Sequence, residues 1–183
     1  MAATKRFSKP YKWRGSMSAA EARAADTASF AVPAADEAKT QALAAALARQ
    51  CEPGDCILLS GDLGTGKTTF ARGFILALCP QAGDIVSPTF TLVQTYPAGA
   101  GTIWHFDLYR LKNREEIAET GLEEALQTGL TLIEWPELIR QQLPDDALTV
   151  TMGLTGDAGR RALTFTGRQG AWGSRLNRLK DAL

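Results

Sequence analysis

The stretch Cys56-Ile-Leu-Leu-Ser60-Gly61-Asp-Leu-Gly-Thr-Gly66-Lys67-Thr68 decides the fold. Its second part matches the pattern G-x-x-x-x-G-K-[ST], the phosphate-binding loop or P-loop, at every fixed position. The apolar run 56–60 before the loop has the form of a strand that is buried on both faces of a sheet. After the loop, residues 67–78 place Phe70 and Phe74 at helical spacing. A strand, a glycine-rich loop and a helix in this order predict a single P-loop NTPase domain of the α/β class.

The chemistry of phosphate binding explains the residue types in this loop. Glycines let the backbone curl, so that successive N–H groups converge on phosphate oxygens. The helix that begins near Gly66 points the positive end of its dipole at the same anion. Lys67 adds a cation for the β- and γ-phosphates, and the Thr68 hydroxyl can ligate Mg²⁺. The predicted nucleotide-binding residues here are Gly61, Asp62, Leu63, Gly64, Thr65, Gly66, Lys67, Thr68 and Thr69.

Two further predicted strands end in a carboxylate, the first in Asp107 and the second in Glu134. In open α/β sheets the ligand lies outside the carboxyl ends of the strands, so both acids are expected to face the metal. Glu134 follows the more uniformly apolar run and is the predicted metal-linked carboxylate. Asp107 is expected either to bind the metal indirectly or to position the attacking water. With Lys67 the two acids form the predicted catalytic set, and with Thr68 the predicted metal-binding set.

A segment rich in hydroxyl groups, Ser87-Pro-Thr-Phe-Thr91, lies between the P-loop helix and the next strand. A loop at this place can sense the γ-phosphate, and Thr89 is the candidate residue. The alternative is an ordinary Ser/Thr-Pro turn. His105 has the opposite strand parity to Trp104 and Phe106, and we expect it to be structural rather than catalytic.

The remaining segments predict a mixed sheet flanked by helices. Over residues 148–154, large apolar residues alternate with Thr or Gly. A turn-like stretch follows at 156–159. After it, Arg161, Leu163 and Phe165 occupy every second position and so share one face of a strand. This pattern predicts a C-terminal antiparallel hairpin. Further strands are expected over 28–32 (ending at Pro33), 90–96, 102–106 and 130–133, and helices over 34–50, 113–126 (with a break at Gly121) and 172–183.

The formal net charge of zero conceals an uneven distribution of charge. Residues 1–20 carry five basic side chains and no acid, and residues 158–183 carry six basic side chains and one acid. The segment between them holds 9 basic and 19 acidic residues. We expect residues 1–27 to form a basic, disordered N-terminal extension and residues 28–183 to form the P-loop ATPase domain. An acidic helical face, either solvated or a docking surface for partner proteins, carries Glu115, Glu116, Glu119, Glu123 and Glu124.

Composition excludes several classes of protein. With 45% hydrophobic and 22% charged residues, the chain is in the globular range and is not wholly disordered. No apolar run approaches the roughly 18–20 residues that span a bilayer, so a membrane protein is not expected. Three scattered cysteines and one histidine fit neither a disulfide framework nor a zinc site, and they indicate a reducing cytoplasm.

Four blocks of sequence occur in a recognisable order. They are residues 61–74, the segment 87–93 with Tyr96, His105-Phe-Asp-Leu-Tyr-Arg110, and Glu134-Trp-Pro136. With these blocks the chain resembles the TsaE (YjeE) family, small P-loop ATPases of bacterial tRNA threonylcarbamoyladenosine modification. The resemblance extends over about residues 29–163 and excludes both basic ends.

The resemblance implies an enzyme that binds and hydrolyses ATP with Mg²⁺, weakly when it is alone. It also implies TsaB-like and TsaD-like partners, which carry out the threonylcarbamoyl transfer, so tRNA is met only through the complex. The family's phosphate-loop residues map onto residues 61–69, and its metal and catalytic acids map onto Asp107 and Glu134. Trp135 carries over as a residue of the nucleotide pocket or of a partner interface.

Two other functions are compatible with the same P-loop. A small-molecule or nucleotide kinase shares the loop and the size of the chain, but it needs an acceptor pocket. A scaffold that binds ATP without turnover is the non-enzymatic alternative. The products formed from ATP separate these functions from an ATPase.

Overall fold

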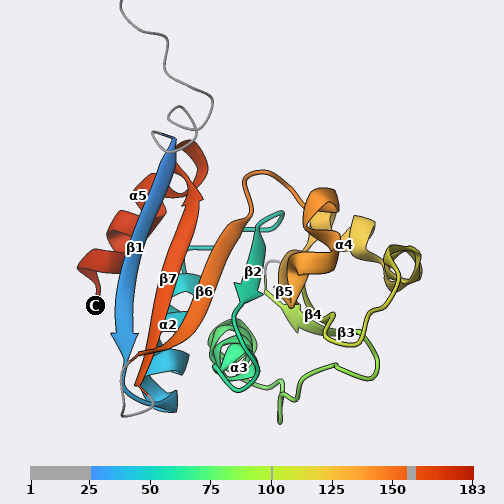
Figure 1. Ribbon diagram of the computed structural model, residues 1–183, viewed down its shortest axis with the longest axis horizontal. Helices are drawn as coiled ribbons and strands as arrows, with labels where there is room; N and C mark the ends of the chain where they lie inside the picture. Colours follow the sequence, from blue (N-terminus) through green and yellow to red (C-terminus); the bar gives the residue numbers. More distant parts are fainter. Residues whose placement is uncertain (1–25, 100, 156–159) are drawn as a thin grey trace, which may run out of the picture.

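The computed structural model describes residues 26–99, 101–155 and 160–183. Its centre is a seven-stranded sheet with the order β1-β7-β6-β2-β5-β4-β3 (Figure 1). The strands are β1 (Thr27–Ala34), β2 (Cys56–Ser60), β3 (Val93–Ala98), β4 (Gly101–Asp107), β5 (Leu130–Glu134), β6 (Leu148–Thr155) and β7 (Arg160–Arg168). The α-helices are α2 (Glu37–Ala48), α3 (Lys67–Leu78), α4 (Leu122–Thr128) and α5 (Gln169–Asp181), and two 3₁₀ helices are η1 (Arg114–Thr120) and η2 (Pro136–Gln142).

The sheet is mixed, and the P-loop strand lies at its centre. β2 pairs in parallel with β5 on one side and with β6 on the other, and β4 pairs in parallel with β5. The pairs β1–β7, β6–β7 and β3–β4 are antiparallel. The predicted α/β class, the mixed sheet and the C-terminal hairpin are therefore confirmed, whereas the turn expected at 156–159 lies outside the described residues.

Side chains of β2 alternate between two apolar cores, one on each face of the sheet. Ile57 and Leu59 pack in the core that holds α2, α3 and α5. Cys56 and Leu58 pack in the other core, with residues of η1, α4 and η2. Burial of each large apolar side chain contributes roughly 1.5–3 kcal/mol, so β2 is fixed from both faces. The loop that follows β2 therefore starts from a rigid base.

The first strand and the first described helix differ from their predicted limits. β1 does not end at Pro33, because Pro33 pairs with Ala162 and the strand continues to Ala34. Proline is tolerated there because β1 is an edge strand. α2 begins three residues later than predicted, because the Asp36 side chain accepts a 2.7 Å hydrogen bond from the Lys39 amide and caps the helix. Of the predicted extension 1–27, Thr27 belongs to the strand, Asp26 precedes it in a turn, and residues 1–25 lie outside the described residues.

The strand predicted from Phe90 starts only at Val93. The amides of Thr91 and Leu92 both donate to the Pro88 carbonyl, so this segment forms a turn. Phe90 is 82% exposed, and Leu92 has a positive φ of 64°. The predicted break at Gly121 is confirmed, although the segment before it is 3₁₀ rather than α-helical. The last helix starts three residues earlier than predicted, at Gln169.

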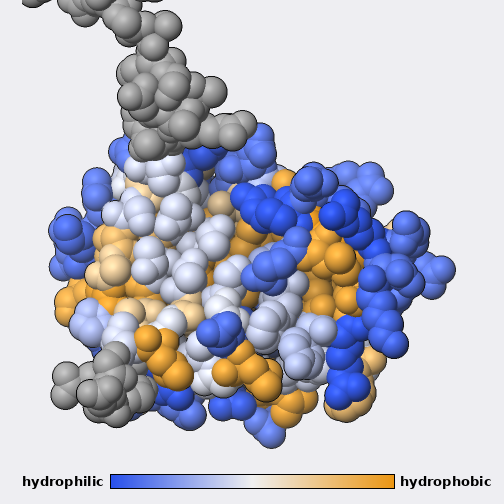
Figure 2. Space-filling model, in the orientation of Figure 1, coloured by the Kyte–Doolittle hydropathy of each residue, from blue (hydrophilic) through white to orange (hydrophobic). Residues whose placement is uncertain are grey.

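The acidic face of the η1–α4 region is solvent-exposed. All five of its glutamates are exposed. Figure 2 shows apolar side chains on the same part of the surface, bordered by hydrophilic ones. A groove in this region is lined by Ile117, Leu122 and Leu126 together with Glu115 and Glu123. In the ranges that the structure describes, no helix has the length and apolar character needed to cross a bilayer.

Candidate functional site

The P-loop connects the end of β2 to the first turn of α3, and its backbone depends on a close approach to β6. Gly61 has a φ of +135°, and a Cβ at this position would lie 2.2 Å from the carbonyl oxygen of Met152. Any side chain would therefore strain the backbone and push β6 away. Gly61 and Asp62 present their carbonyls toward the side chain of Lys67. The start of the loop is thus fixed by the sheet itself.

Lys67 is 5% exposed and has contacts on two sides. Its Nζ donates to the carbonyl oxygens of Gly61 and Asp62 at 2.7 and 2.9 Å. The same atom lies 3.6 Å from the centroid of the Trp135 ring, a cation–π contact. Burial lowers the pKa of the Lys67 ammonium, and nearby carboxylates, foremost Glu134, oppose that change. The lysine is therefore a desolvated cation at the head of the loop.

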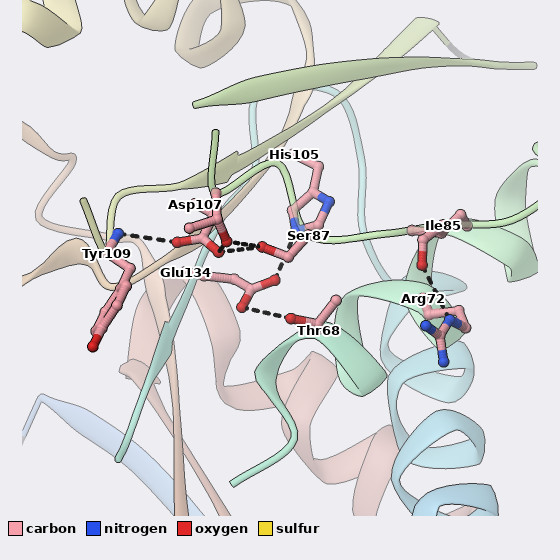
Figure 3. A network of polar contacts seen from close by, with 9 residues as sticks. Thr68, Arg72, Ile85, Ser87, His105, Asp107, Tyr109 and Glu134 are labelled. Atoms are coloured by element: carbon pink, nitrogen blue, oxygen red, sulfur yellow. Dashed lines mark hydrogen bonds and ion pairs between the residues drawn. The ribbon is translucent and has the colours of Figure 1, made fainter. Parts of the chain in front are cut away.

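Glu134, at the end of β5, joins the P-loop helix to β4. Its Oε2 accepts a 3.0 Å hydrogen bond from the Thr68 hydroxyl, and its Oε1 lies 2.9 Å from His105 Nε2 (Figure 3). Glu134 is 2% exposed and His105 is fully buried. Both oxygens of a buried carboxylate thus have partners, which holds the group in one orientation.

Asp107 lies beside Glu134 in register on the neighbouring parallel strand. Its Oδ2 accepts hydrogen bonds from the hydroxyls of Ser87 and Thr89, and its Oδ1 accepts from the Tyr109 amide at 3.0 Å. Figure 3 shows this cluster next to the contacts of Glu134. The hydroxyl-rich segment is therefore held in place by hydrogen bonds to the acid at the end of β4.

A cavity of about 300 Å³ opens between the P-loop and these acids. Ten of the predicted residues line it: Leu63, Gly64, Gly66, Lys67, Thr68, Thr69, Thr89, Asp107, Glu134 and Trp135. The other three predicted residues, Gly61, Asp62 and Thr65, do not line the cavity but form contacts within the loop. For Thr65 this is a 2.8 Å hydrogen bond from its hydroxyl to the Asp62 carbonyl.

Sequence reasoning missed four residues that line the cavity, namely Glu37, Ser87, Tyr109 and Arg161. Two of them could have been predicted, because Ser87 and Tyr109 belong to segments already identified from the sequence. Glu37 and Arg161 come from α2 and β7, whose positions beside the P-loop require the strand order. His105 is a further case, since it contacts Glu134 although parity alone indicated a structural role.

The donor set at the cavity fits a magnesium ion. Mg²⁺ prefers oxygen ligands and is usually held by one or two carboxylates together with substrate phosphates. Thr68 and Glu134 offer a hydroxyl and a carboxylate 3.0 Å apart, with Asp107 next to them. Among the described residues no group of three or more His, Cys, Asp or Glu side chains could hold a metal by itself.

Trp135 follows Glu134 in an unusual backbone conformation. Its φ is +59°, and its amide donates to the Leu59 carbonyl at 3.2 Å. The indole packs at the edge of an apolar core and lines the cavity, where it contacts Lys67 and, at 5.0 Å between ring centroids, Tyr109. Strain of this kind costs of order 1–3 kcal/mol and concentrates at functional sites.

Comparisons with known proteins agree on one family. The model of the family described as "Threonylcarbamoyl adenosine biosynthesis protein TsaE" matches residues 34–162. The chain is 50% identical over 121 residues to the tRNA threonylcarbamoyladenosine biosynthesis protein TsaE of Rickettsia bellii, covering 66% of this chain and 84% of that protein. It is 38% identical over 146 residues to the TsaE protein of Bacillus subtilis, covering 79% and 87%.

A solved structure gives the same answer. The crystal structure of Bacillus subtilis YdiB superposes with a TM-score of 0.72 at 30% identity, covering 85% of this chain and 97% of the other. The family model covers the chain from Ala34, before α2, to Ala162 in β7, and so includes the whole P-loop and the strand-end acids. The chain belongs to the TsaE family of threonylcarbamoyl adenosine biosynthesis proteins.

Proposed function

We propose that this protein is a Mg²⁺-dependent ATPase that serves as an accessory subunit of the tRNA threonylcarbamoyladenosine machinery in the cytoplasm. The domain expected over residues 28–183 provides the activity, which is weak without TsaB-like and TsaD-like partners. The chain itself does not transfer the threonylcarbamoyl group, and it meets tRNA through the complex. The observation that supports the proposal best is the Thr68–Glu134 hydrogen bond in the same cavity wall as Lys67.

The residues of the cavity divide the reaction among them. The P-loop amides and Lys67 bind and orient the phosphates, and Lys67 offsets negative charge that grows on the β–γ bridging oxygen. A water attacks the γ-phosphorus as the bond to the ADP oxygen breaks, and one proton of the water passes to an oxygen of the released phosphate and on to solvent. Asp107, held by Ser87 and Thr89, is the group that orients this water. Trp135 and Tyr109, in contact with each other, form one wall of the cavity.

The metal requirement follows from the same residues. Thr68 and Glu134 would hold Mg²⁺, with Asp107 beside them. Bound there, the ion would neutralise charge on the β- and γ-phosphates. His105 keeps the Glu134 carboxylate turned toward Thr68 through its Nε2. Removal of divalent ions with a chelator is accordingly expected to stop phosphate release.

Replacement of the P-loop lysine tests the proposal. We expect Lys67→Ala to reduce phosphate release from ATP to background while the far-ultraviolet circular dichroism stays unchanged. The reason is that Lys67 is the cation predicted to contact the β- and γ-phosphates. Lys112→Ala removes an exposed lysine outside the cavity and serves as the matched control. Normal hydrolysis by Lys67→Ala would contradict the site assignment.

Two measurements separate the proposal from its alternatives. ATP labelled in the γ-phosphate should yield labelled inorganic phosphate, whereas a kinase would label an organic acceptor. Mixing the chain with purified TsaB-like and TsaD-like proteins should change the rate of phosphate release. Binding of ATP without release, even with the partners and tRNA present, would indicate a scaffold instead.

A further inference from the structure

One basic side chain in the cavity wall comes from the C-terminal hairpin. Arg161 lies in β7 opposite Ala34 of β1, and it is half-buried. It shares its strand face with Leu163 and Phe165, both fully buried. The Phe165 ring lies 6.3 Å from that of Phe70, in the first turn of α3. The hairpin therefore directs Arg161 to the same face of the sheet as the P-loop helix.

Arg161 reaches the P-loop itself. A Cβ built on Gly66 would lie 3.5 Å from Arg161 Nε and 3.7 Å from Arg161 Cδ, with the Cβ of Thr69 at 3.9 Å. Gly66 is the residue directly before the P-loop lysine, and it has a φ of +102°. The arginine thus lies along the loop at the point where α3 begins.

Among the described residues, no partner of the buried Arg161 Nε explains this position. Its Nε is buried and has no hydrogen-bond partner, and none of the ion pairs within the described ranges involves Arg161. A buried donor without a partner is unfavourable, because it has given up its hydrogen bonds to water and gained none. An acceptor brought by a ligand in the adjoining cavity removes that cost, and for a guanidinium the best-fitting acceptor is a phosphate or carboxylate.

The strand order indicates which end of a nucleotide Arg161 meets. β6 and β7 lie on one side of β2, whereas β5 and β4, which carry Glu134 and Asp107, lie on the other. The acids and Thr68 mark the end of the cavity that takes the metal and the terminal phosphate. Arg161 comes from the opposite side of the sheet centre, and both Arg161 and Thr69 lie within 4 Å of the position that a Gly66 Cβ would take. We propose that Arg161 binds the α-phosphate of the nucleotide.

This inference rests on the proposed function and adds a binding residue to it. A group that contacts the α-phosphate binds substrate and product alike, because ATP and ADP both carry that phosphate. Such uniform binding lowers KM and leaves kcat unchanged. An arginine on the γ-phosphate would instead raise kcat with little effect on KM, since its contact would strengthen only as the phosphoryl group is transferred.

The test compares Arg161→Ala with Arg168→Ala, which removes an exposed arginine from the other end of the same strand. Dissociation constants for ATP and ADP are measured by calorimetry, and kcat and KM by phosphate release. For Arg161→Ala we expect both dissociation constants and KM to rise by the same factor, about 10–100-fold, with kcat within about twofold of wild type. Arg168→Ala should match the wild type in all four quantities.

Other results overturn the inference in distinguishable ways. A fall in kcat with unchanged ADP binding would place Arg161 on the γ-phosphate, and unchanged constants throughout would remove it from the site. In both cases the wild type still hydrolyses ATP, so the proposed function survives. A wild-type chain that binds neither nucleotide contradicts both proposals. If Arg161→Ala does not fold, Arg161→Met, which keeps an apolar stem, gives the same comparison.

Discussion

Glu134 shows how a single side chain can join separate parts of the chain at the site. One carboxylate oxygen accepts from Thr68 in α3, and the other pairs with His105 in β4. An ionised carboxylate only accepts hydrogen bonds, so His105 carries its proton on Nε2. The other ring nitrogen, Nδ1, is buried and has no partner among the described residues. The contact to His105 therefore fixes both the histidine tautomer and the orientation of the acid.

Substitution of Glu134 tests its part in hydrolysis. We expect Glu134→Gln to lower the rate of phosphate release by about 10²–10⁴-fold, because a neutral amide of the same shape would hold Mg²⁺ less well than a carboxylate does. The P-loop is untouched, so nucleotide binding should remain measurable by calorimetry. Glu137→Gln changes an exposed acid three residues away and should behave as wild type. A Glu134→Gln enzyme with activity within a few-fold of wild type would remove this acid from the catalytic set.

Strand parity explains which site residues could be predicted from the sequence. Both strand-end acids were predicted together, because the carboxyl ends of parallel strands meet at one edge. His105 is on the same face of the sheet as Asp107, two residues along β4, and its diagonal neighbour on β5 is Glu134. Register between two strands is not visible in a single sequence. The contact of His105 with Glu134 could therefore not be predicted. Nor could the place of Arg161 in the cavity wall, because it depends on the order of the strands in the sheet.

Among the helices, α2 and α3 pack so closely that one glycine is required between them. A Cβ at Gly73 of α3 would lie 2.5 Å from the Gln41 Cα and 2.6 Å from the Gln41 carbonyl oxygen. These are backbone atoms of α2, which cannot rotate away. We expect Gly73→Ala to lower the free energy of unfolding by about 1–3 kcal/mol, the usual cost of overpacking, measured by urea denaturation.

A second glycine in a helix provides the control for this prediction. Gly170 of α5 has nothing within 4 Å of an added Cβ. Gly170→Ala should therefore leave stability unchanged or raise it by up to about 1 kcal/mol, as alanine favours helix. Equal effects of the two substitutions would show that helix propensity, rather than contact with α2, decides the outcome.

The helices and strands themselves were predictable where local signals agreed. β2 and α3 have their predicted limits, since the apolar run ends at a glycine loop and the helix follows directly. The errors arose where a contact distant in sequence prevailed, as at Pro33, which β7 keeps within the sheet. At Phe90 the cause was a turn with a positive φ at Leu92, which residue preferences do not indicate.

On the scale of the whole molecule, the basic C-terminal segment partly serves the fold. Arg175 forms an ion pair with Asp55 and also donates to the Gln50 carbonyl, and Arg178 donates to the Gln50 side chain. These contacts attach α5 to the connection between α2 and β2. Arg168 also lies 3.9 Å from Asp26 and from Asp145, so within the described ranges at least three of the six basic side chains of this segment have partners in the chain. Part of the positive charge at the C-terminal end thus holds the last helix against the segment that leads into the P-loop strand.

Global stability should also depend on a buried thiol at alkaline pH. Burial raises the pKa of the Cys56 thiol from 9.0 to about 12, and the side chain is 3% exposed. As pH rises above about 9, the unfolded chain loses this proton first, so the contribution to stability is complete below pH 9 and is lost progressively toward pH 12. Between about pH 8 and pH 10.5, the stronger ionisation of this thiol in the unfolded chain should lower the free energy of unfolding by about 2 kcal/mol.

The variant Cys56→Ala isolates this contribution from the other groups that titrate in the same range. Its free energy of unfolding should be lower than that of the wild type at pH 8, because the substitution leaves a small cavity beside Leu58. The gap should then narrow by about 2 kcal/mol at pH 10.5, because the variant has no thiol at this position to ionise. Urea unfolding curves at the two pH values measure both effects. Parallel losses in the two proteins would mean that Cys56 ionises as readily in the folded chain as in the unfolded one.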